Sequence, residues 1–187
     1  MAQAAKVFAS QGYDQTTMQE VASSMGLATG ALYHYFSGKE QLLIAICNQL
    51  LDPLMERADA LVAQNGDPET ELRDLVRLWV EHVVTHRDHM LVFQQERHVI
   101  EVGERWRKVR ANRKAFERLA GGSLARAIEW TEPEEPLPLL ALLGMVNYTA
   151  QWFRPRGHLT PQQIANGYVD LVLGVSSPAT LNGDRHV

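Results

Sequence analysis

The chain has 187 residues, of which 45% are hydrophobic, with a formal net charge of −4 and an isoelectric point near 6.0. This length suits one large domain or a small domain fused to a medium one, and the hydrophobic share is enough for a sizeable core. The charge lacks the basic excess that is typical of nucleic-acid-binding proteins, so any contact with DNA must be local.

The single cysteine and the apolar runs bear on the compartment. Cys47 cannot form an internal disulfide, which fits a reducing cytosol, and we interpret it as a small buried side chain within a helix. The longest apolar run, residues 137–146, is interrupted by Pro138 and is too short to span a bilayer. No charged and then apolar leader opens the chain. The sequence therefore predicts a soluble cytoplasmic protein that does not enter a membrane.

Hydrophobic residues recur at spacings of three and four along nearly the whole chain, and no long stretch alternates apolar with polar residues. This pattern predicts an all-α fold of about nine helices. A first helix ends at Gly12. The capping-box pair of Thr17 and Glu20 starts a second helix, which ends at Gly26, and a short third helix runs through Tyr35.

The rest of the chain is predicted to form a larger helical body. Ser37 and Glu40 make another capping-box pattern, which opens a long fourth helix over residues 38–64. After a break at residues 65–68, further helices are expected over residues 69–86, 89–99, 104–130, 139–153 and 161–175. The expected domains are a helix-turn-helix domain over residues 1–45, a ligand-binding and dimerisation domain over residues 46–175, and a flexible tail over residues 176–187.

Residues 16–43 have the layout of a helix-turn-helix, in which a helix of about seven residues meets a tight turn and a second short helix follows. Ala22 is small enough to let the two helices cross closely, and Gly26 permits the turn. The residues expected to pack inward are Val21, Leu27, Leu32, Tyr35 and Phe36. The residues left facing outward, toward DNA, are Thr29, Gly30, Tyr33 and His34.

The string over residues 26–40, Gly-Leu-Ala-Thr-Gly-Ala-Leu-Tyr-His-Tyr-Phe-Ser-Gly-Lys-Glu, resembles the signature of the TetR family of transcriptional regulators. Residues 5–17 are also similar to that family's first helix, so the match is dense over residues 4–43. The resemblance implies a dimeric repressor that inserts the second helix of the motif into the major groove of operator DNA. Carried over by position, it implies contacts with DNA, mainly with phosphate, for Thr16, Thr17, Thr29, Gly30, Tyr33, His34 and Lys39.

Two features depart from the family pattern. Ala28 stands where the family often has a hydroxyl residue, so a helix cap or a phosphate contact is expected to be missing there. Residues 1–51 carry only two lysines, Lys6 and Lys39, against three acidic residues. Family members usually have a basic arm and one or two more helical turns before this point, whereas Met1 falls inside the expected first helix. We therefore expect the natural protein to begin upstream, and this form to bind DNA weakly.

In such proteins the last two helices usually pair with their copies, forming a four-helix bundle between two chains. Here apolar residues share one face on each of the last two predicted helices. The residues assigned to the dimer contact are Leu139, Leu143, Val146, Ile164, Tyr168 and Leu171. The alternative is an ordinary face buried within one chain. We favour the homodimer because pseudo-palindromic operators require two-fold symmetry.

The sequence around residues 151–163 resembles a subgroup of TetR proteins that regulate lipid and sterol breakdown and respond to acyl-CoA thioesters. Residues 104–118 carry a run of cationic side chains, among which Arg110 and Arg113 are the candidates for contacts with coenzyme A phosphates. The alternative is a solvated helix face. The remaining pocket candidates, which are aromatic, apolar or amide side chains of the middle helices, are Trp79, Val83, Phe93, Gln94, Trp106, Phe116, Asn147 and Trp152.

Other classes of function find little support in the sequence. His82 and His86 are four residues apart near His89, but no cysteine or paired carboxylate completes a set, so we expect no metal site and no cofactor. The chain has no Gly-rich phosphate loop, nucleophile elbow or paired-cysteine pattern, so we expect no enzyme. The prediction is a ligand-responsive repressor; the main alternative is a helical small-molecule-binding or interaction protein without a DNA function.

Overall fold

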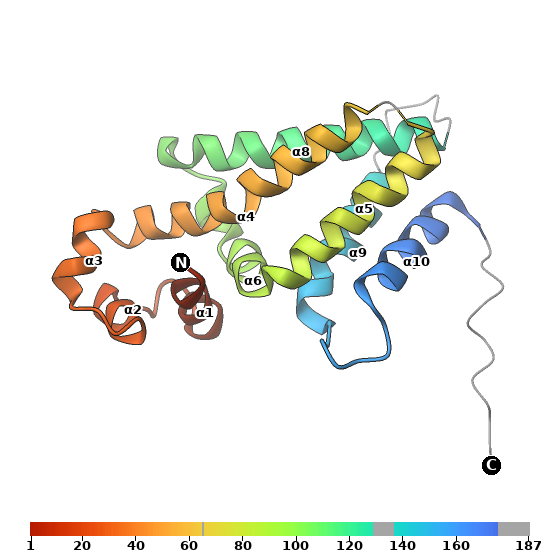
Figure 1. The fold of residues 1–187 in the computed structure, drawn as a ribbon. Coiled ribbons are helices and arrows are strands. Elements are labelled where there is room, and N and C mark those ends of the chain that lie inside the picture. Colours follow the sequence, from red (N-terminus) through yellow and green to blue (C-terminus); the bar gives the residue numbers. More distant parts are fainter. Residues whose placement is uncertain (65, 129–136, 176–187) are drawn as a thin grey trace, which may run out of the picture.

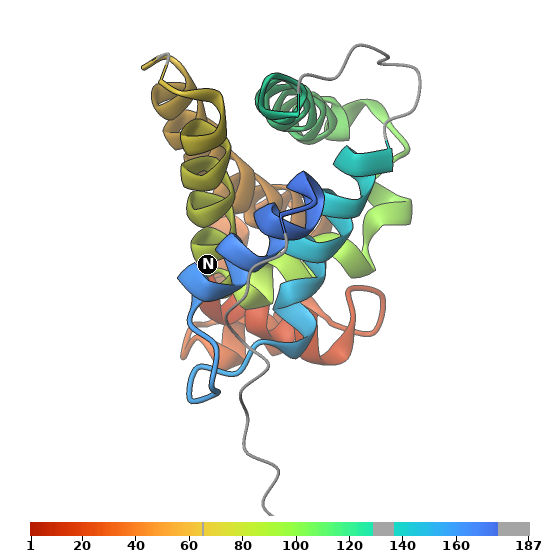
Figure 2. The same ribbon diagram turned by 90° about the vertical axis from the view of Figure 1, so that its right-hand side faces the viewer.

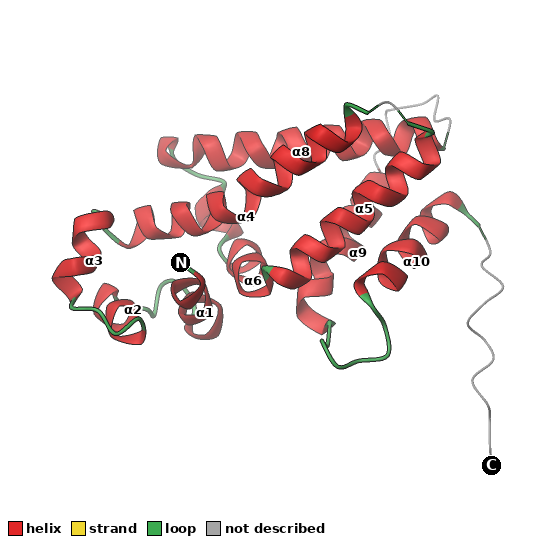
Figure 3. Cartoon of the chain, in the orientation of Figure 1, coloured by secondary structure: helices red, strands yellow, loops and turns green. Residues whose placement is uncertain are grey.

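The computed structural model describes residues 1–64, 66–128 and 137–175, which form ten α-helices and one 3₁₀ turn without any strand (Figures 1 and 3). The predicted all-α class is confirmed, with ten α-helices in these ranges against the nine expected. The flexible tail predicted for residues 176–187 lies outside the described residues. Within the described ranges, no helix is both long and apolar enough to cross a membrane.

The first three helices and the start of the fourth pack around one small core. They are α1 (Ala2–Gln11), α2 (Met18–Ser24), α3 (Thr29–Tyr35) and α4 (Lys39–Val62). Phe8, Val21 and Leu32 are almost fully buried in this core, together with Leu42 and Ile46 of α4. The predicted start of α2 is confirmed, because the Thr17–Glu20 capping box forms. Gly12 and Gly26 adopt positive φ angles of 83° and 68°, a conformation that glycine tolerates best.

The fourth helix has a different start from the one predicted. Gly38, not Ser37, is its N-cap, and no side chain caps it. Gln41 Oε1 instead accepts a hydrogen bond from the backbone N–H of Ser37 at 2.5 Å. The Ser37–Glu40 capping box was therefore a wrong prediction. The helix nevertheless runs without interruption to Val62, through Pro53.

The body consists of the far half of α4 and the remaining helices. The remaining helices are α5 (Pro68–Thr85), α6 (Arg87–Gln95), α7 (Arg97–Ile100), the 3₁₀ turn η1 (Glu104–Trp106), α8 (Arg107–Ala127), α9 (Leu137–Trp152) and α10 (Pro161–Leu173). Of these, α5, α6 and α8 pack against α4, while α9 and α10 pack against α5 (Figures 1 and 2). Helices α4, α5, α6, α8 and α9 thus enclose the centre of the body.

Element boundaries in the body differ from those predicted. The single helix expected over residues 89–99 is two helices, α6 and α7. Helix α9 begins at Leu137 rather than Leu139. Pro138 is therefore in its first turn, where a missing backbone N–H removes no intrahelical hydrogen bond.

The N-terminal helices and the body share part of their packing. Val92, Ile100, Trp106 and Val109, all from the body, are buried in the same cluster as the N-terminal helices. Helix α1 also packs against α6. A movement of the body can therefore reach the N-terminal helices through α4, α6 and the segment that precedes α8.

Candidate functional sites

Helix α3 presents one buried side chain and a largely exposed surface. Leu32 is only 2% exposed and anchors the helix to the N-terminal core. Tyr33 is 51% exposed, and Gly30 and His34 are exposed beside it. Apart from its chain neighbours and the backbone of its own helix, no described atom lies within 4 Å of the position that a Gly30 Cβ would take. Three of the four residues predicted to face outward, Gly30, Tyr33 and His34, are therefore exposed.

The inner face of the motif is smaller than predicted. Val21 is fully buried and Phe36 is half-buried, as expected. Leu27 is 40% exposed, because it precedes the first turn of α3 and does not reach the core. Tyr35 is 77% exposed, so its prediction as a core aromatic was wrong. Its ring instead extends the exposed aromatic surface of α3.

Helix α3 begins without a side-chain cap. Ala28 is its N-cap residue and has no side-chain hydrogen-bond acceptor, as the sequence predicted. The first backbone N–H groups of α3 therefore lack the side-chain acceptor that a serine or threonine would supply. Thr29, at the first position of the helix, is half-buried.

The two threonines before α2 have different environments. Thr16 is 1% exposed, and its hydroxyl donates to the Gly12 carbonyl oxygen at 2.7 Å. The predicted contact of Thr16 with DNA would need an exposed side chain, so this prediction was wrong. Thr17 is exposed, and its hydroxyl oxygen accepts from the Glu20 backbone N–H. The Thr17 backbone N–H donates to the Glu20 carboxylate and lowers the pKa of that group.

The start of α4 is attached on two sides. The Lys39 ammonium donates to the carbonyl oxygens of Tyr13 at 2.7 Å and Asp14 at 3.2 Å, and lies 4.4 Å from the centre of the Tyr13 ring. Glu40 accepts from Trp106 Nε1 at 3.1 Å and from Arg105 Nη1 at 2.9 Å. Lys39 therefore has a structural role within the N-terminal helices, and Glu40 ties α4 to the segment before α8.

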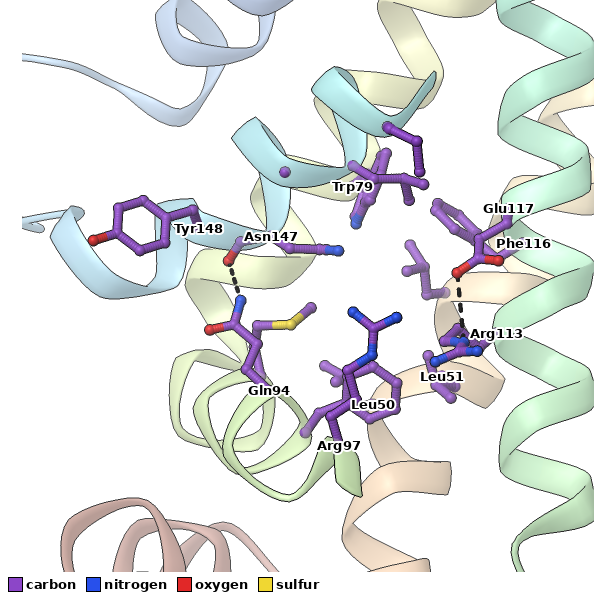
Figure 4. A pocket seen from close by; sticks show the side chains of 16 residues that line it. Leu50, Leu51, Trp79, Gln94, Arg97, Arg113, Phe116, Glu117, Asn147 and Tyr148 are labelled. Carbon is purple, nitrogen blue, oxygen red and sulfur yellow. Dashed lines mark hydrogen bonds and ion pairs between the residues drawn. The ribbon is translucent and has the colours of Figure 1, made fainter. Parts of the chain in front are cut away.

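A pocket of about 370 Å³ lies at the centre of the body, between α4, α5, α6, α8 and α9 (Figure 4). Its lining is mainly apolar. From α4 come Leu50, Leu51 and Leu54, and the aromatic side chains are Trp79, Phe93, Phe116 and Tyr148. The rings of Trp79 and Phe116 meet edge to face, with centroids 4.8 Å apart. This lining suits a ligand with a hydrophobic part.

Polar groups gather at two places in the pocket wall. Gln94 Nε2 donates to the Asn147 carbonyl oxygen at 2.7 Å, and Gln94 Oε1 accepts from Gln151 at 3.0 Å. Arg113 and Glu117 of α8 form an ion pair at 3.4 Å on the opposite side (Figure 4). The pocket therefore combines apolar walls with an amide pair and a charged group.

The structure brings together part of the predicted ligand set. Trp79, Phe93, Gln94, Arg113, Phe116 and Asn147 line the pocket. The other four do not. Val83 and Trp106 are buried in the two cores. Arg110 bonds to the carbonyl oxygens of Ile100 and Gly103. Trp152, 37% exposed, ends α9.

Sequence reasoning missed the leucines of α4 and Arg97 as lining residues. The three- and four-residue spacing of Leu50, Leu51 and Leu54 was a signal for one buried helix face, but the same spacing serves a core without a cavity. Arg97 lies outside the cationic run of residues 104–118, so the sequence pattern did not identify it as a lining residue.

The last two helices bury some of the residues assigned to a dimer. Val146 is fully buried and Ile164 is 4% exposed, so both pack inside their own chain. The Tyr168 hydroxyl lies 2.9 Å from Thr149 Oγ1, within the same helix pair. Leu139 and Leu143 are half-buried against the same core. Of the predicted set, only Leu171 is largely exposed, at 72%.

Large apolar side chains are exposed on other faces of these two helices. On α9 they are Leu137, Leu140, Tyr148 and Trp152; on α10 and its end they are Leu171 and Val175. Leu140 and Tyr148 also line the pocket. The sequence pattern thus selected mostly the face of these helices that serves the internal core.

The three histidines of interest form a stack between α4, α5 and α6. The rings of His82 and His86 are stacked with centroids 4.1 Å apart, and His89 meets His86 edge to face at 5.8 Å. Burial lowers the pKa of His82 to about 4 and also lowers the pKa of His89. In the described part of the chain, no group of three or more histidine, cysteine or acidic side chains is placed to hold a metal ion.

Comparison with known proteins agrees with this architecture. The chain is 27% identical over 175 residues to the HTH-type transcriptional repressor KstR2 of Mycobacterium tuberculosis, covering 91% of this chain and 88% of that protein. The structure of KstR2 from that organism matches with a TM-score of 0.81 over 92% of this chain and 90% of the other, at 27% identity. That of PfmR from Thermus thermophilus, described as a TetR family transcriptional regulator, matches at 0.79 and 29% identity over 92% and 96%.

A third structural match is AibR, solved in complex with isovaleryl coenzyme A and operator DNA, with a TM-score of 0.76 and 29% identity over 91% of this chain and 94% of that one. Two family models also match. Residues 1–46 fit the model described as bacterial regulatory proteins of the tetR family. Residues 65–175 fit the tetracyclin repressor-like C-terminal domain. The chain therefore belongs to the TetR family of bacterial transcriptional regulators.

Proposed function

We propose that the chain is a ligand-responsive repressor that binds a pseudo-palindromic operator as a homodimer and is released from it by a small effector. The observation that carries this proposal is the surface of α3. Gly30, Tyr33 and His34 are exposed together on a helix that Leu32 anchors to the core. A short helix fixed on one side and open on the other fits the recognition helix of a helix-turn-helix. Because operator DNA is the proposed partner, we expect the protein to act in the cytoplasm.

The proposed dimer uses the exposed apolar surface of the last two helices. Leu137 and Trp152 of α9 and Leu171 of α10 are all more than a third exposed. Several large apolar side chains on adjacent elements are a marker of an interaction surface in a protein of this size. A two-fold pair through α9 and α10 would place two copies of α3 to read the two halves of a palindromic site.

The proposed effector site is the central pocket. Its apolar walls support an effector with a hydrophobic part, and the charged pair of Arg113 and Glu117 supports a polar group on the same effector. The class of effector that we favour is an acyl-CoA thioester. AibR, which this chain resembles over most of its length, was solved with isovaleryl coenzyme A and operator DNA. Leu50, Leu51 and Leu54 belong to α4, which begins among the DNA-binding helices. A ligand against these leucines can therefore act on the position of α3.

Selection of binding sites from a pool of random DNA duplexes, followed by titration of the selected duplex, tests this function. We expect an operator to be selected. The variant Gly30→Leu should fold, because the added Cβ would meet no described atom outside its own helix turn within 4 Å and leucine favours a helix. Its side chain would separate α3 from the groove, so operator affinity should fall at least about tenfold.

The matched control is Ala60→Leu, the same type of substitution at an exposed helical position of the body. It should bind the operator as the unmodified chain does. If no duplex is selected, the repressor function is wrong. If Gly30→Leu binds with undiminished affinity, α3 is not the helix that reads DNA.

A further inference from the structure

Arg97 of α7 and Arg113 of α8 bring two positive charges to one side of the pocket (Figure 4). Both pair with the same carboxylate. Glu101 Oε1 lies 2.5 Å from Arg113 Nη1 and 3.4 Å from Arg97 Nε. The hydrogen bond from Arg113 is the main reason that the pKa of Glu101 lies below its usual value. Glu101 is therefore ionised at neutral pH and serves as the internal anion of this arginine pair.

Arg113 retains hydrogen-bonding capacity beside the pocket. Its side chain is 16% exposed. Its Nε is buried and has no hydrogen-bond partner among the described residues, although Glu117 Oε1 lies 3.4 Å away as an ion-pair partner. A buried guanidinium N–H without an acceptor is unfavourable. An anionic ligand group at this end of the pocket would supply acceptors to Arg113 and charge to Arg97.

Glu101 also belongs to the segment that attaches the body to α4. Arg110 Nη1 donates to the carbonyl oxygens of Ile100 at 3.2 Å and Gly103 at 2.8 Å, which holds this segment against α8. The same segment ends at Trp106, whose Nε1 donates to Glu40 in the first turn of α4. The ion pair of Glu101 with Arg113, which lines the pocket, and the hydrogen bond of Glu40 at the start of α4 are thus joined by a few residues.

We propose that Arg97 and Arg113 form an anion subsite of the pocket, that Glu101 occupies it in this structure, and that the anionic group of an amphiphilic effector replaces Glu101 there. The apolar part of the effector lies against the leucines of α4 and Trp79. The anionic group is a carboxylate or a phosphate. The displaced Glu101 releases residues 101–106 from α8. This weakens the contact of Trp106 with Glu40 and, resting on the proposed function, lowers affinity for the operator.

Calorimetric titration with three probes of equal chain length, decanoate, decyl phosphate and decanol, tests the subsite. At least one anionic probe should bind about tenfold more tightly than decanol, because a charge-assisted hydrogen bond adds to equal apolar contact. Glu101→Gln should bind that anion several-fold more tightly and leave decanol unchanged, because the internal competitor is gone. Glu104→Gln, an exposed acid on the same segment, is the matched control and should change neither affinity.

Arg97→Met and Arg113→Met should abolish the preference for the anion. Arg97 is 74% exposed, so its variant is expected to fold even if the Arg113 variant does not. Tighter binding of decanoate than of decyl phosphate assigns a carboxylate, and the reverse assigns a phosphate; either supports the subsite. Equal affinity for all three probes, or binding of none of them, overturns it.

The coupling to DNA has a separate measurement. Without any probe, Glu101→Gln should bind the selected operator several-fold more weakly than Glu104→Gln does. Equal operator affinity of the two variants overturns the coupling. If the chain binds the operator but shows no preference for an anionic probe, the subsite is wrong and the proposed repressor function stands. The two failures are therefore distinguishable.

Discussion

The ring of His82 is buried between α4 and α5, and its Nε2 lies 2.7 Å from the Leu50 carbonyl oxygen. Because the acceptor is a carbonyl, Nε2 carries the proton and donates it. Burial lowers the pKa of this ring to about 4, with smaller contributions from His86, Arg57 and His89. The neutral ring thus links two helices that both line the pocket.

This environment predicts a loss of stability in mild acid. In the unfolded chain His82 takes up a proton near pH 6.5, whereas in the folded chain it does so only near pH 4. Between these values the unfolded state binds more protons, so the free energy of unfolding falls as the pH falls through this window. We expect it to be about 2 kcal/mol lower at pH 5 than at pH 7, as measured by urea unfolding.

His82→Gln is the informative variant, because its amide can donate to Leu50 but does not titrate. It should remove most of this pH dependence, and His89, whose pKa is also lowered by burial, should account for part of the remainder. The exposed His98→Gln should leave the dependence unchanged. Equal stability of the unmodified chain at both pH values would contradict this description of His82.

Single residues also show which parts of the pocket lining could be predicted from the sequence. The basic run on α8 made Arg110 and Arg113 equal candidates, yet only Arg113 lines the pocket. Arg110 instead binds carbonyl oxygens of the segment before α8. The two lie three positions apart on one helix and differ only in what packs opposite them. That difference depends on tertiary structure, which helical periodicity does not contain.

At the scale of elements, the strongest predictions came from local hydrogen-bonding patterns. The capping box at Thr17 formed as predicted, because both of its hydrogen bonds lie within four residues. The similar pattern at Ser37 failed because Glu40 is drawn to Trp106 and Arg105 of a distant segment. A capping signal is thus reliable only where no tertiary partner competes for the acidic residue.

Helix α10 offers a direct test of capping energy. Thr160 Oγ1 accepts from the Gln163 backbone N–H at 3.2 Å, and Gln163 Oε1 accepts from the Thr160 N–H at 2.9 Å. Thr160→Ala should lower the free energy of unfolding by about 1 kcal/mol, because it leaves an N-terminal N–H of the helix without its acceptor. Thr160→Ser keeps the hydroxyl and should retain most of the stability. If denaturant unfolding gives the alanine and serine variants the same stability, the capping box contributes nothing here.

At the scale of the whole molecule, the sequence predicted an N-terminal helix-turn-helix domain joined to a larger helical body. The family resemblance over residues 4–43 carried that prediction. The choice of face on the last two helices went wrong for Val146 and Ile164 because the internal core and a dimer contact both require apolar residues at helical spacing. Only the packing of α9 and α10 against α5 shows which face is used internally.

The exposed face of α10 gives a prediction for the assembly. Leu171→Glu should convert the proposed dimer to a monomer in sedimentation equilibrium, because it places a charge in an apolar contact without a partner. Leu171 is 72% exposed within the chain, so the variant should fold. Leu159→Glu, on the loop before α10 and 47% exposed, is the control and should stay dimeric. A monomeric unmodified chain, or a dimeric Leu171→Glu variant, would refute the proposed contact.

In the proposed complex, two copies of α3 read successive major grooves of one operator. Methylation protection at guanine N7, an atom of the major groove, measures this directly on the selected duplex. We expect two protected segments related by two-fold symmetry, with centres about 10 base pairs apart, and we expect both to disappear in Gly30→Leu. A single protected segment, or a pattern unchanged by Gly30→Leu, would contradict it.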